Sequence, residues 1–192
     1  MNPTAMAAIF AVGLVLVVVA FLVLATYNAV IALRLRIDKA WANIDVALKQ
    51  RFDQLPNLVE AVRDVMAWEQ EVLTEVAAAR TAYSPTAAIP DQAATSAATS
   101  AAVRSLFAVV ERYPEVRSAG NVMALQEEIE RLEGMIADRR ELYNDQVYRY
   151  NARIAQVPAV FLAWLFGWRA RPFFEASEAD RSRPETSLET EA

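Results

Sequence analysis

The sequence predicts an all-α protein in which an N-terminal transmembrane helix continues directly into a long antiparallel bundle of three to four helices. Three observations lead to this prediction. An uncharged apolar run opens the chain, and two long stretches farther on carry apolar residues at helical spacing. The chain of 192 residues also holds only four glycines, which favours long helices over sheets and tight turns.

The apolar run from Ala5 to Ala25 predicts a helix that spans a membrane. A helix of this length rises about 31 Å, which matches the hydrocarbon core of a bilayer. The residues before it contain no Lys or Arg, although a cleaved signal peptide needs positive charge there. We therefore expect a retained anchor over residues 1–25.

Positive charge follows the predicted span, at Arg34, Arg36 and Lys39, and none precedes it. Segments rich in Lys and Arg remain on the cytoplasmic side of a membrane. The sequence therefore predicts a single-pass protein whose N-terminus lies outside and whose domain lies in the cytoplasm.

After the span, apolar residues recur every three or four positions over residues 37–66, as on one face of a helix. Pro56 interrupts this stripe, and a proline inside a helix removes a backbone hydrogen bond and crowds the preceding turn. We expect a kink or a break there, either a structural bend or a hinge, with Asn57 bonding a freed backbone group. The helix is expected to continue over residues 58–83.

A loop and a shorter helix are expected in the middle of the chain. Prolines mark a loop at the start of residues 84–100, and Asp91 is a candidate N-cap for the Ala-rich helix that follows. Apolar residues spaced three and four apart between Val103 and Val110 predict that a helix ends near Arg112.

The second long helix is expected from Val122 to Val157, with a stripe interrupted only where Arg139 stands. A helix of this length spans about 54 Å and can lie antiparallel to the first. The run of glutamates within it is assigned to the solvated face because a di-metal bundle site would also need histidines. Its members are Glu127, Glu128, Glu130 and Glu133.

Polar and aromatic residues on the two long helices are candidates either for contacts between helices or for a surface that binds a partner. Two Tyr-Asn steps lie seven residues apart, so they share one helix face. The full set is Trp41, Asn43, Asp45, Pro56, Asn57, Tyr143, Asn144, Tyr150 and Asn151.

Eight large apolar side chains crowd into residues 158–174, a segment too short to span a membrane. It is expected either to lie on the bilayer or to fold as a lid over the open end of the bundle. The candidates for the membrane interface are Phe161, Trp164, Trp168 and Phe173. The remaining residues 175–192 hold six acids and two arginines and are expected to be a disordered tail.

Composition argues against several functions. Without any His or Cys, the usual zinc, haem and iron–sulfur ligand sets are missing, so we expect neither a metal nor another cofactor. Residues 1–174 are close to neutral, which argues against nucleic-acid binding. No nucleophile motif or phosphate loop is present, and an enzyme using Asp, Glu, Arg and Tyr would need a buried carboxylate pair in a pocket.

The chain resembles the LemA family of bacterial membrane-anchored proteins. The resemblance rests on Tyr27-Asn28, AWANIDVALKQRFDQLPNLVEAV (Ala40 to Val62), Glu69, Ala79-Arg80, Glu111, Tyr113-Pro114, YNDQVYRYN (Tyr143 to Asn151), Pro158, Phe166-Gly167 and Phe173-Phe174-Glu175. It implies a helical bundle behind one membrane helix, in the bacterial inner membrane, and it implies no catalytic residues. The chain departs from the family at Trp68, Gly134 and residues 118–122, so a role for the family's usual histidine at position 68 is absent.

From these observations we expect four segments: an anchor (1–25), a helical bundle (26–157), an aromatic cap or interfacial segment (158–174) and the tail (175–192). The expected function is a non-enzymatic membrane-anchored scaffold or interaction module at the bacterial cytoplasmic membrane. The alternative is a lipid-binding or membrane-remodelling protein that uses the aromatic segment. Expected partners are the lipid bilayer and an unidentified membrane or cytoplasmic protein, with homo-oligomers possible and no nucleic acid.

Overall fold

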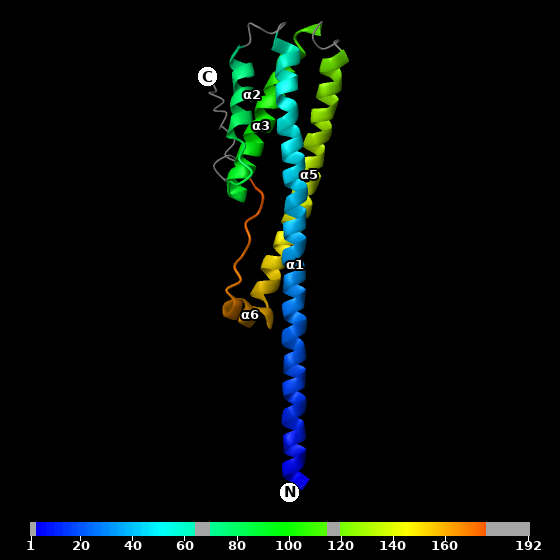
Figure 1. Cartoon of the computed structure of the whole chain (residues 1–192), viewed down its shortest axis with the longest axis vertical. Coiled ribbons are helices and arrows are strands. Elements are labelled where there is room, and N and C mark those ends of the chain that lie inside the picture. Colours follow the sequence, from blue (N-terminus) through cyan, green and yellow to red (C-terminus); the bar gives the residue numbers. More distant parts are fainter. Residues whose placement is uncertain (1–2, 64–69, 115–119, 176–192) are drawn as a thin grey trace, which may run out of the picture. The chain divides into compact units, whose positions relative to one another are not determined.

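The computed structural model describes residues 3–63, 70–114 and 120–175 (Figure 1). Within these ranges the long regular elements are all helices, and no strand occurs. They are α1 (Pro3–Arg63), α2 (Gln70–Ala82), α3 (Ile89–Val110), α5 (Gly120–Ala155) and α6 (Ala159–Phe166). The predicted all-α class, with a long apolar helix at the N-terminus, is confirmed.

Helix α1 runs for 61 residues through the predicted span and stalk without a break. Pro56 lies inside it, so the chain does not break at this proline, and the alternative, a kink, stays a prediction. Leu55 and Leu58 flank Pro56 and are fully buried, and this packing holds both sides of the proline in one helix although a backbone hydrogen bond is lost. Asn57 does not rescue the backbone: its Nδ2 donates to the Gln54 side-chain oxygen at 3.1 Å.

The single helix expected over residues 58–83 is also wrong, because the chain reverses direction between α1 and α2. The Tyr83 hydroxyl donates to Asp45 Oδ1 at 2.9 Å, and the Tyr83 ring stacks on Phe52 at 4.3 Å between centroids. In an unbroken helix, residues 45 and 83 would stand about 57 Å apart. Residues 64–69, between the two helices, lie outside the described residues.

Contacts divide the chain into two compact units, which we describe separately. The anchor unit comprises Met1–Trp41 and Leu142–Arg171, and the bundle unit comprises Ala42–Glu141 and Pro172–Ala192. Helices α1 and α5 each contribute residues to both units. The four-segment division expected from the sequence stays a prediction, and residues 176–192 of the expected tail lie outside the described residues.

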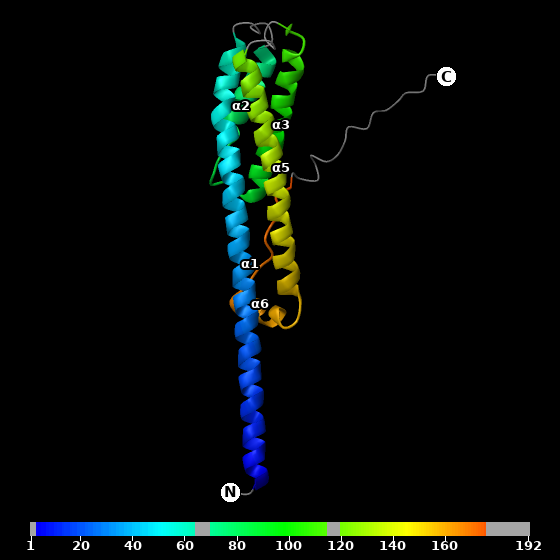
Figure 2. The same cartoon turned by 90° about the vertical axis from the view of Figure 1, so that its right-hand side faces the viewer.

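In the bundle unit, α2, α3 and parts of α1 and α5 lie side by side (Figures 1 and 2). Helix α5 is antiparallel to α1, because Asn43 lies opposite Arg139 and Arg51 lies opposite Glu133. Arg139 interrupts the apolar stripe of α5 because its Nη1 donates to the Asn43 carbonyl oxygen at 2.6 Å. The largest fully buried apolar side chains of this unit are Ile44, Leu48, Leu55, Leu58, Leu106, Ile129 and Leu132.

Helix α3 begins two residues before the expected cap. Its N-cap is Ala88, and Asp91 lies in the first turn rather than at the cap. A carboxylate in the first turn still interacts favourably with the helix dipole. Pro90 is tolerated beside it, because the first N–H groups of a helix have no partner within the helix.

In the anchor unit, α1 and the second half of α5 pair through buried apolar and aromatic side chains. Val30, Ile37, Tyr143, Val147 and Tyr150 form the core of this pairing. The α5 helix ends at Ala155, so Val157, expected as the last core residue of the stripe, instead lies beyond the helix and is 72% exposed. The physical reason is Pro158, which disfavours helical backbone at the residue before it.

Candidate functional site

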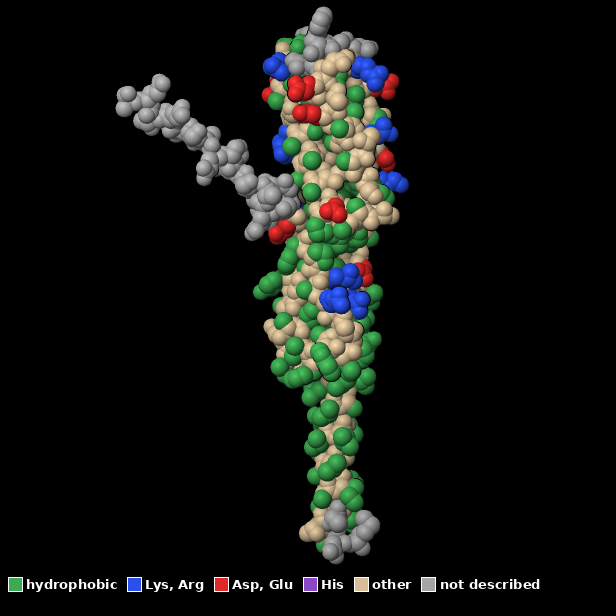
Figure 3. All heavy atoms as spheres, turned by 90° about the vertical axis from the view of Figure 1, so that its left-hand side faces the viewer, with side chains coloured by type: hydrophobic (Ala, Val, Ile, Leu, Met, Phe, Trp, Pro, Cys, Tyr) green, Lys and Arg blue, Asp and Glu red, His purple; other side chains and the backbone are tan. Residues whose placement is uncertain are grey.

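The N-terminal part of α1 presents apolar side chains on all sides. No residue of its most apolar stretch is buried (Figure 3), and a helix that is apolar all round and uncovered by protein is typical of a membrane span. Helix α3 is also long and apolar enough to span a membrane, but 44% of its most apolar stretch is buried, and its buried face is part of the bundle core. We therefore assign the membrane anchor to α1.

Helix α6 lies directly beside the residues that follow the span. The Tyr27 ring meets the Phe166 ring edge-on at 5.3 Å between centroids and lies 5.7 Å from the Trp168 ring. The rings of Phe166 and Trp168 stack at 5.5 Å. We call Tyr27, Phe166 and Trp168 the aromatic cluster. Tyr and Trp are the residues that accumulate at the interface between bilayer and water.

The two faces of α6 differ sharply in burial. Ala159, Leu162 and Ala163 are buried. Large side chains on the other face project away from the unit: Trp164 is 86% exposed and Phe161 is 68% exposed. Contiguous apolar surface of this kind marks a site that contacts a membrane or another molecule.

Gly167 ends α6 and redirects the chain. Its φ of 64° lies in the left-handed region that favours glycine, and the Trp168 N–H donates to the Ala163 carbonyl oxygen at 2.9 Å. The returning segment is then held by Asn151, whose Nδ2 donates to the Arg171 carbonyl oxygen at 3.0 Å. The Arg171 N–H donates back to Asn151 Oδ1 at 2.8 Å. These bonds fix residues 167–171 against α5.

The redirected segment closes a pocket of about 290 Å³ within the anchor unit, which we call the arginine pocket. Its walls are Arg34 from α1, Tyr150 from α5 and the segment from Phe166 to Arg171. Arg171 Nη2 lies 3.4 Å from Asp38 Oδ1, an exposed and weak ion pair. The pocket thus brings together three arginines, at positions 34, 169 and 171, that are up to 137 positions apart in the sequence.

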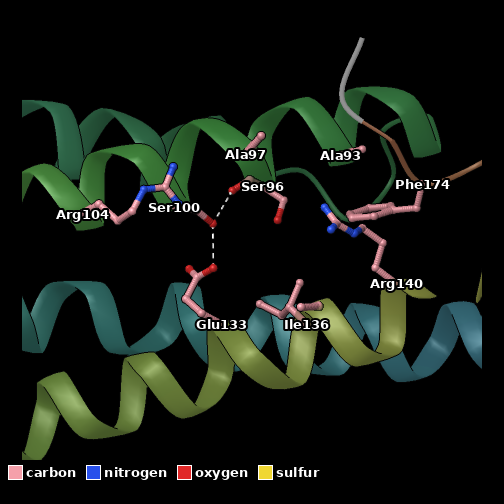
Figure 4. Close-up of a pocket in the computed structure, with 10 residues that line it drawn as sticks. Ala93, Ser96, Ala97, Ser100, Arg104, Glu133, Ile136, Arg140 and Phe174 are labelled. Carbon is pink, nitrogen blue, oxygen red and sulfur yellow. Dashed lines mark hydrogen bonds between the residues drawn. The ribbon is translucent and has the colours of Figure 1, made fainter. Parts of the chain in front are cut away.

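A second polar site lies inside the bundle unit around Arg51, which is fully buried. Its Nη1 donates to Glu133 Oε1 at 2.7 Å and to Ser100 Oγ at 2.9 Å, and its Nη2 donates to Ser96 Oγ at 3.1 Å. Ser100 in turn donates to Glu133 Oε2 at 2.7 Å (Figure 4). We call these four residues the arginine network, and it joins α1, α3 and α5.

The charge of Arg51 is held in place by its partners. Burial lowers the pKa of Arg51 below its usual value, and the carboxylate of Glu133 opposes that shift. The Arg51 Nε is buried without a hydrogen-bond partner. Because a buried charge needs partners at hydrogen-bond distance, the network favours the register in which Arg51 meets Ser96, Ser100 and Glu133.

Beside the arginine network, α3 and α5 line a cavity of about 330 Å³, with Arg104 and Arg140 at its walls and Phe174 at one end (Figure 4). Glu133 is the one carboxylate in the lining, and it is paired with Arg51. The carboxylate pair that an enzyme of this composition would need is therefore not found in this cavity. Among the described residues, no group of three Asp or Glu side chains could hold a metal ion.

The aromatic candidates on the long helices belong to the anchor unit, where Tyr143 and Tyr150 are core residues and Trp41 is half-buried. The ring of Trp41 meets that of Tyr143 edge-on at 5.8 Å, and Tyr143 and Tyr150 are both buried. Asn151 bonds the non-helical segment after α6 rather than a neighbouring helix. Asn144, which lies on the same face of α5 as Asn151, is half-buried.

The candidates in the first half of α1 have different environments. Asp45 accepts a hydrogen bond from the Tyr83 hydroxyl. Asn43 is exposed, and its backbone carbonyl oxygen accepts a hydrogen bond from Arg139. Pro56 lines a groove of about 400 Å³ between α1 and α2, and Asn57 is exposed.

The four candidates for the membrane interface do not form one group. Phe161 and Trp164 are exposed on α6, and Trp168 is half-buried in the aromatic cluster. Phe173 belongs to the bundle unit and is 37% exposed.

Sequence reasoning missed Arg51, although a signal was present. Position 51 follows Leu48 by three residues and precedes Leu55 by four, so it falls on the buried face of α1. The assignment of Glu133 to a solvated face is wrong, because this residue pairs with Arg51 and is only 31% exposed. Glu127 and Glu130 are exposed as expected.

The described fold and the uncovered span define an all-helical protein anchored by an N-terminal membrane helix. The chain belongs to the LemA family, whose model matches residues 40–188. Two magnetosome proteins of Paramagnetospirillum magneticum (strain ATCC 700264 / AMB-1), MamQ 1 and MamQ 2, are each 33% identical to it over 78 residues. Magnetosome protein MamQ of Magnetospirillum gryphiswaldense (strain DSM 6361 / JCM 21280 / NBRC 15271 / MSR-1) is 32% identical over a stretch of the same length. These alignments cover 41% of this chain and 29% of each relative.

The arginine network predicts an ordering of stabilities. Glu133→Ala leaves the Arg51 charge buried without its carboxylate and should lower the free energy of unfolding by about 3 kcal/mol, the lower end for a broken buried pair. Arg51→Met removes the charge itself and leaves Glu133 near solvent, so it should cost less, about 1 kcal/mol. Chemical denaturation of the full chain in detergent micelles, followed by circular dichroism, measures both. The control is Glu127→Ala, which removes an exposed glutamate from the same helix as Glu133. A larger loss in the free energy of unfolding for Arg51→Met than for Glu133→Ala would contradict this account.

Tyr83 predicts a loss of stability at alkaline pH. Burial raises the pKa of Tyr83 to about 12, and Asp45 adds to this as hydrogen-bond acceptor and negative charge. A tyrosine in the unfolded chain ionises near about 10. The stabilisation from neutral Tyr83 is therefore complete below pH 10 and lost between pH 10 and 12.

Tyr83→Phe should therefore reduce the drop in melting temperature between pH 9 and pH 11.5, measured by circular dichroism. A residual drop is expected, because burial also raises the pKa of Tyr143 to about 12. The exposed Tyr148→Phe is the matched control and should leave the drop unchanged. An unchanged drop for Tyr83→Phe would show that the Asp45 contact does not hold Tyr83 neutral.

Proposed function

We propose that this protein is a non-enzymatic scaffold that holds a helical bundle at the cytoplasmic face of the bacterial inner membrane and contacts the bilayer twice, through α1 and through α6. The observation that carries the proposal is the position of α6. It packs on Tyr27, at the end of the apolar span, and leaves Phe161 and Trp164 uncovered.

The aromatic cluster sets the depth of α6. If residues 5–25 fill the hydrocarbon core, Tyr27 lies where core and headgroups meet. Helix α6 contacts Tyr27 and so lies at the same depth, where its exposed face meets lipid. Transfer of each large apolar side chain out of water contributes about 1.5–3 kcal/mol, enough for a second stable contact. The depth and exposure of α6 support the alternative in which residues 158–174 lie on the bilayer over the one in which they form a lid on the bundle.

The charges of the anchor unit support a cytoplasmic domain. Three basic residues, Arg34, Arg36 and Lys39, directly follow the predicted span. Positive residues within about 15–20 residues of a span determine its orientation. All three fall within this distance of Ala25, the end of the predicted span, and they support a cytoplasmic domain.

A scaffold also needs a surface for a partner, and the groove that contains Pro56 offers one in the bundle unit. Its floor is apolar, with Leu55, Val59 and Val76, while Glu60 and Arg80 stand at its rim. The name of the relatives, magnetosome protein, refers to a cellular structure and to no reaction, which supports a structural role.

Contact of α6 with lipid is tested by spin labelling of the full chain in bilayer nanodiscs. The chain has no cysteine, so Leu165→Cys introduces a single labelling site on the exposed face of α6. Oxygen, which partitions into lipid, should relax this label more strongly than a water-soluble nickel chelate. Tyr148→Cys, exposed on α5, is the control and should show the opposite preference. Equal water exposure of the labels at positions 165 and 148 would show that α6 does not contact the bilayer.

Orientation is tested with the same cysteine-free background. A maleimide that cannot cross membranes should label Thr4→Cys in intact spheroplasts and should label Glu141→Cys only after permeabilisation. Both positions are exposed in the structure, so failure to react reports the membrane barrier. The reverse pattern would place the domain outside.

Partner binding is tested by photo-crosslinking in native membranes. A benzophenone amino acid at Val59, inside the groove, should give a discrete crosslinked product that identification by mass spectrometry assigns to one protein. Lys49, exposed on α1 and outside the groove, is the control position. Identical products from both positions, or none from Val59, would contradict the groove as the partner surface.

A further inference from the structure

We propose that the arginine pocket binds the phosphate of an anionic phospholipid headgroup, so that the anchor unit holds a specific lipid as well as spanning the bilayer. This inference rests on the proposed function, since it takes the anchor unit to stand at the membrane surface. The pocket is lined by side chains from α1, α5 and the segment after α6.

The anchor unit is strongly basic although the chain as a whole is acidic. Its ranges contain seven Arg and Lys residues against two acids, while the chain carries a net charge of −5. Both acids already have basic neighbours: Asp38 lies beside Arg171, and Asp145 pairs with Arg149 at 2.9 Å. Positive charge therefore dominates this unit, and its ligand should be an anion.

The pocket stands at the depth of lipid phosphates. Arg34 is the first charged residue of the chain and follows Tyr27 by seven residues, a rise of about 10 Å. The headgroup layer on each side of the hydrocarbon core is about 5–8 Å thick. A long arginine side chain reaches back along the helix toward that layer. The guanidinium groups and the lipid phosphates therefore occupy the same zone.

The side chains of the pocket match a phosphate diester attached to apolar chains. Guanidinium groups bind phosphate through paired, charge-assisted hydrogen bonds. Phe166 and Trp168 form the apolar part of the same wall and belong to the aromatic cluster. A volume of about 290 Å³ accommodates a headgroup and its phosphate but not two acyl chains, which would remain in the bilayer.

Two arginines of the pocket can be removed without disturbing the fold around it. Arg34→Gln/Arg169→Gln keeps Arg171, its contact with Asp38 and the bonds between Asn151 and the Arg171 backbone. The matched control, Arg36→Gln/Arg153→Gln, removes the same charge from the same unit, on residues outside the pocket. Circular dichroism verifies that both variants are folded.

The test measures retention of phosphatidylglycerol by the full chain, extracted from mixed phosphatidylcholine and phosphatidylglycerol nanodiscs and analysed by native mass spectrometry. The wild type should retain phosphatidylglycerol in preference to phosphatidylcholine. The pocket variant should bind it at least about tenfold more weakly, and the control variant should match the wild type. An equal loss of affinity for phosphatidylglycerol in both variants would show that only the overall charge of the unit matters, and would overturn the proposal.

Two further arms separate the alternatives. Displacement of the lipid by millimolar glycerol phosphate would assign the pocket to a soluble phosphate ester and overturn the lipid assignment. The spin label at position 165 is read in the same nanodiscs. If the label lies in lipid but the protein shows no preference for phosphatidylglycerol, only the proposal of lipid binding in the arginine pocket is contradicted. If the label lies in water, the proposed function is contradicted.

Discussion

The continuity of α1 is the constraint on which the rest of the structure depends. One helix carries the uncovered apolar span, the wall of the arginine pocket at Arg34 and the buried arginine at position 51. Because an α-helix fixes the rise and rotation of each residue, the span sets the depth and face of Arg34 within the anchor unit. Leu55 and Leu58 preserve this continuity across Pro56 by packing on both sides of it.

Polar contacts then specify how the other elements meet this helix. In the bundle unit, the arginine network ties α1 to α3 and α5 through charge-assisted hydrogen bonds that favour the observed register. In the anchor unit, Asn151 does the same for the segment after α6, using backbone groups that would otherwise lack partners. Each unit therefore combines a large apolar core with a few directional bonds.

The proposed function rests on what these contacts bring together after the span. Gly167 reverses the chain so that the aromatic cluster and three arginines adjoin one another, with the apolar face of α6 beside them. Aromatic rings, arginines and uncovered apolar side chains are the three groups that suit the interface between lipid and water. The same arrangement supports both a second membrane contact and a lipid phosphate site.

The sequence by itself determined the helices, the span and most of the buried stripe, because helical periodicity and the length of an apolar run are local properties of the chain. It did not reveal that the chain reverses direction between α1 and α2, since residues 57–83 contain neither Gly nor Pro. The burial of Arg51, the pairing of Glu133 and the gathering of Arg34 with Arg169 were decided only by the tertiary structure. Whether a charged side chain is buried or exposed depends on partners dozens of positions away, and only the packing of distant elements supplies them.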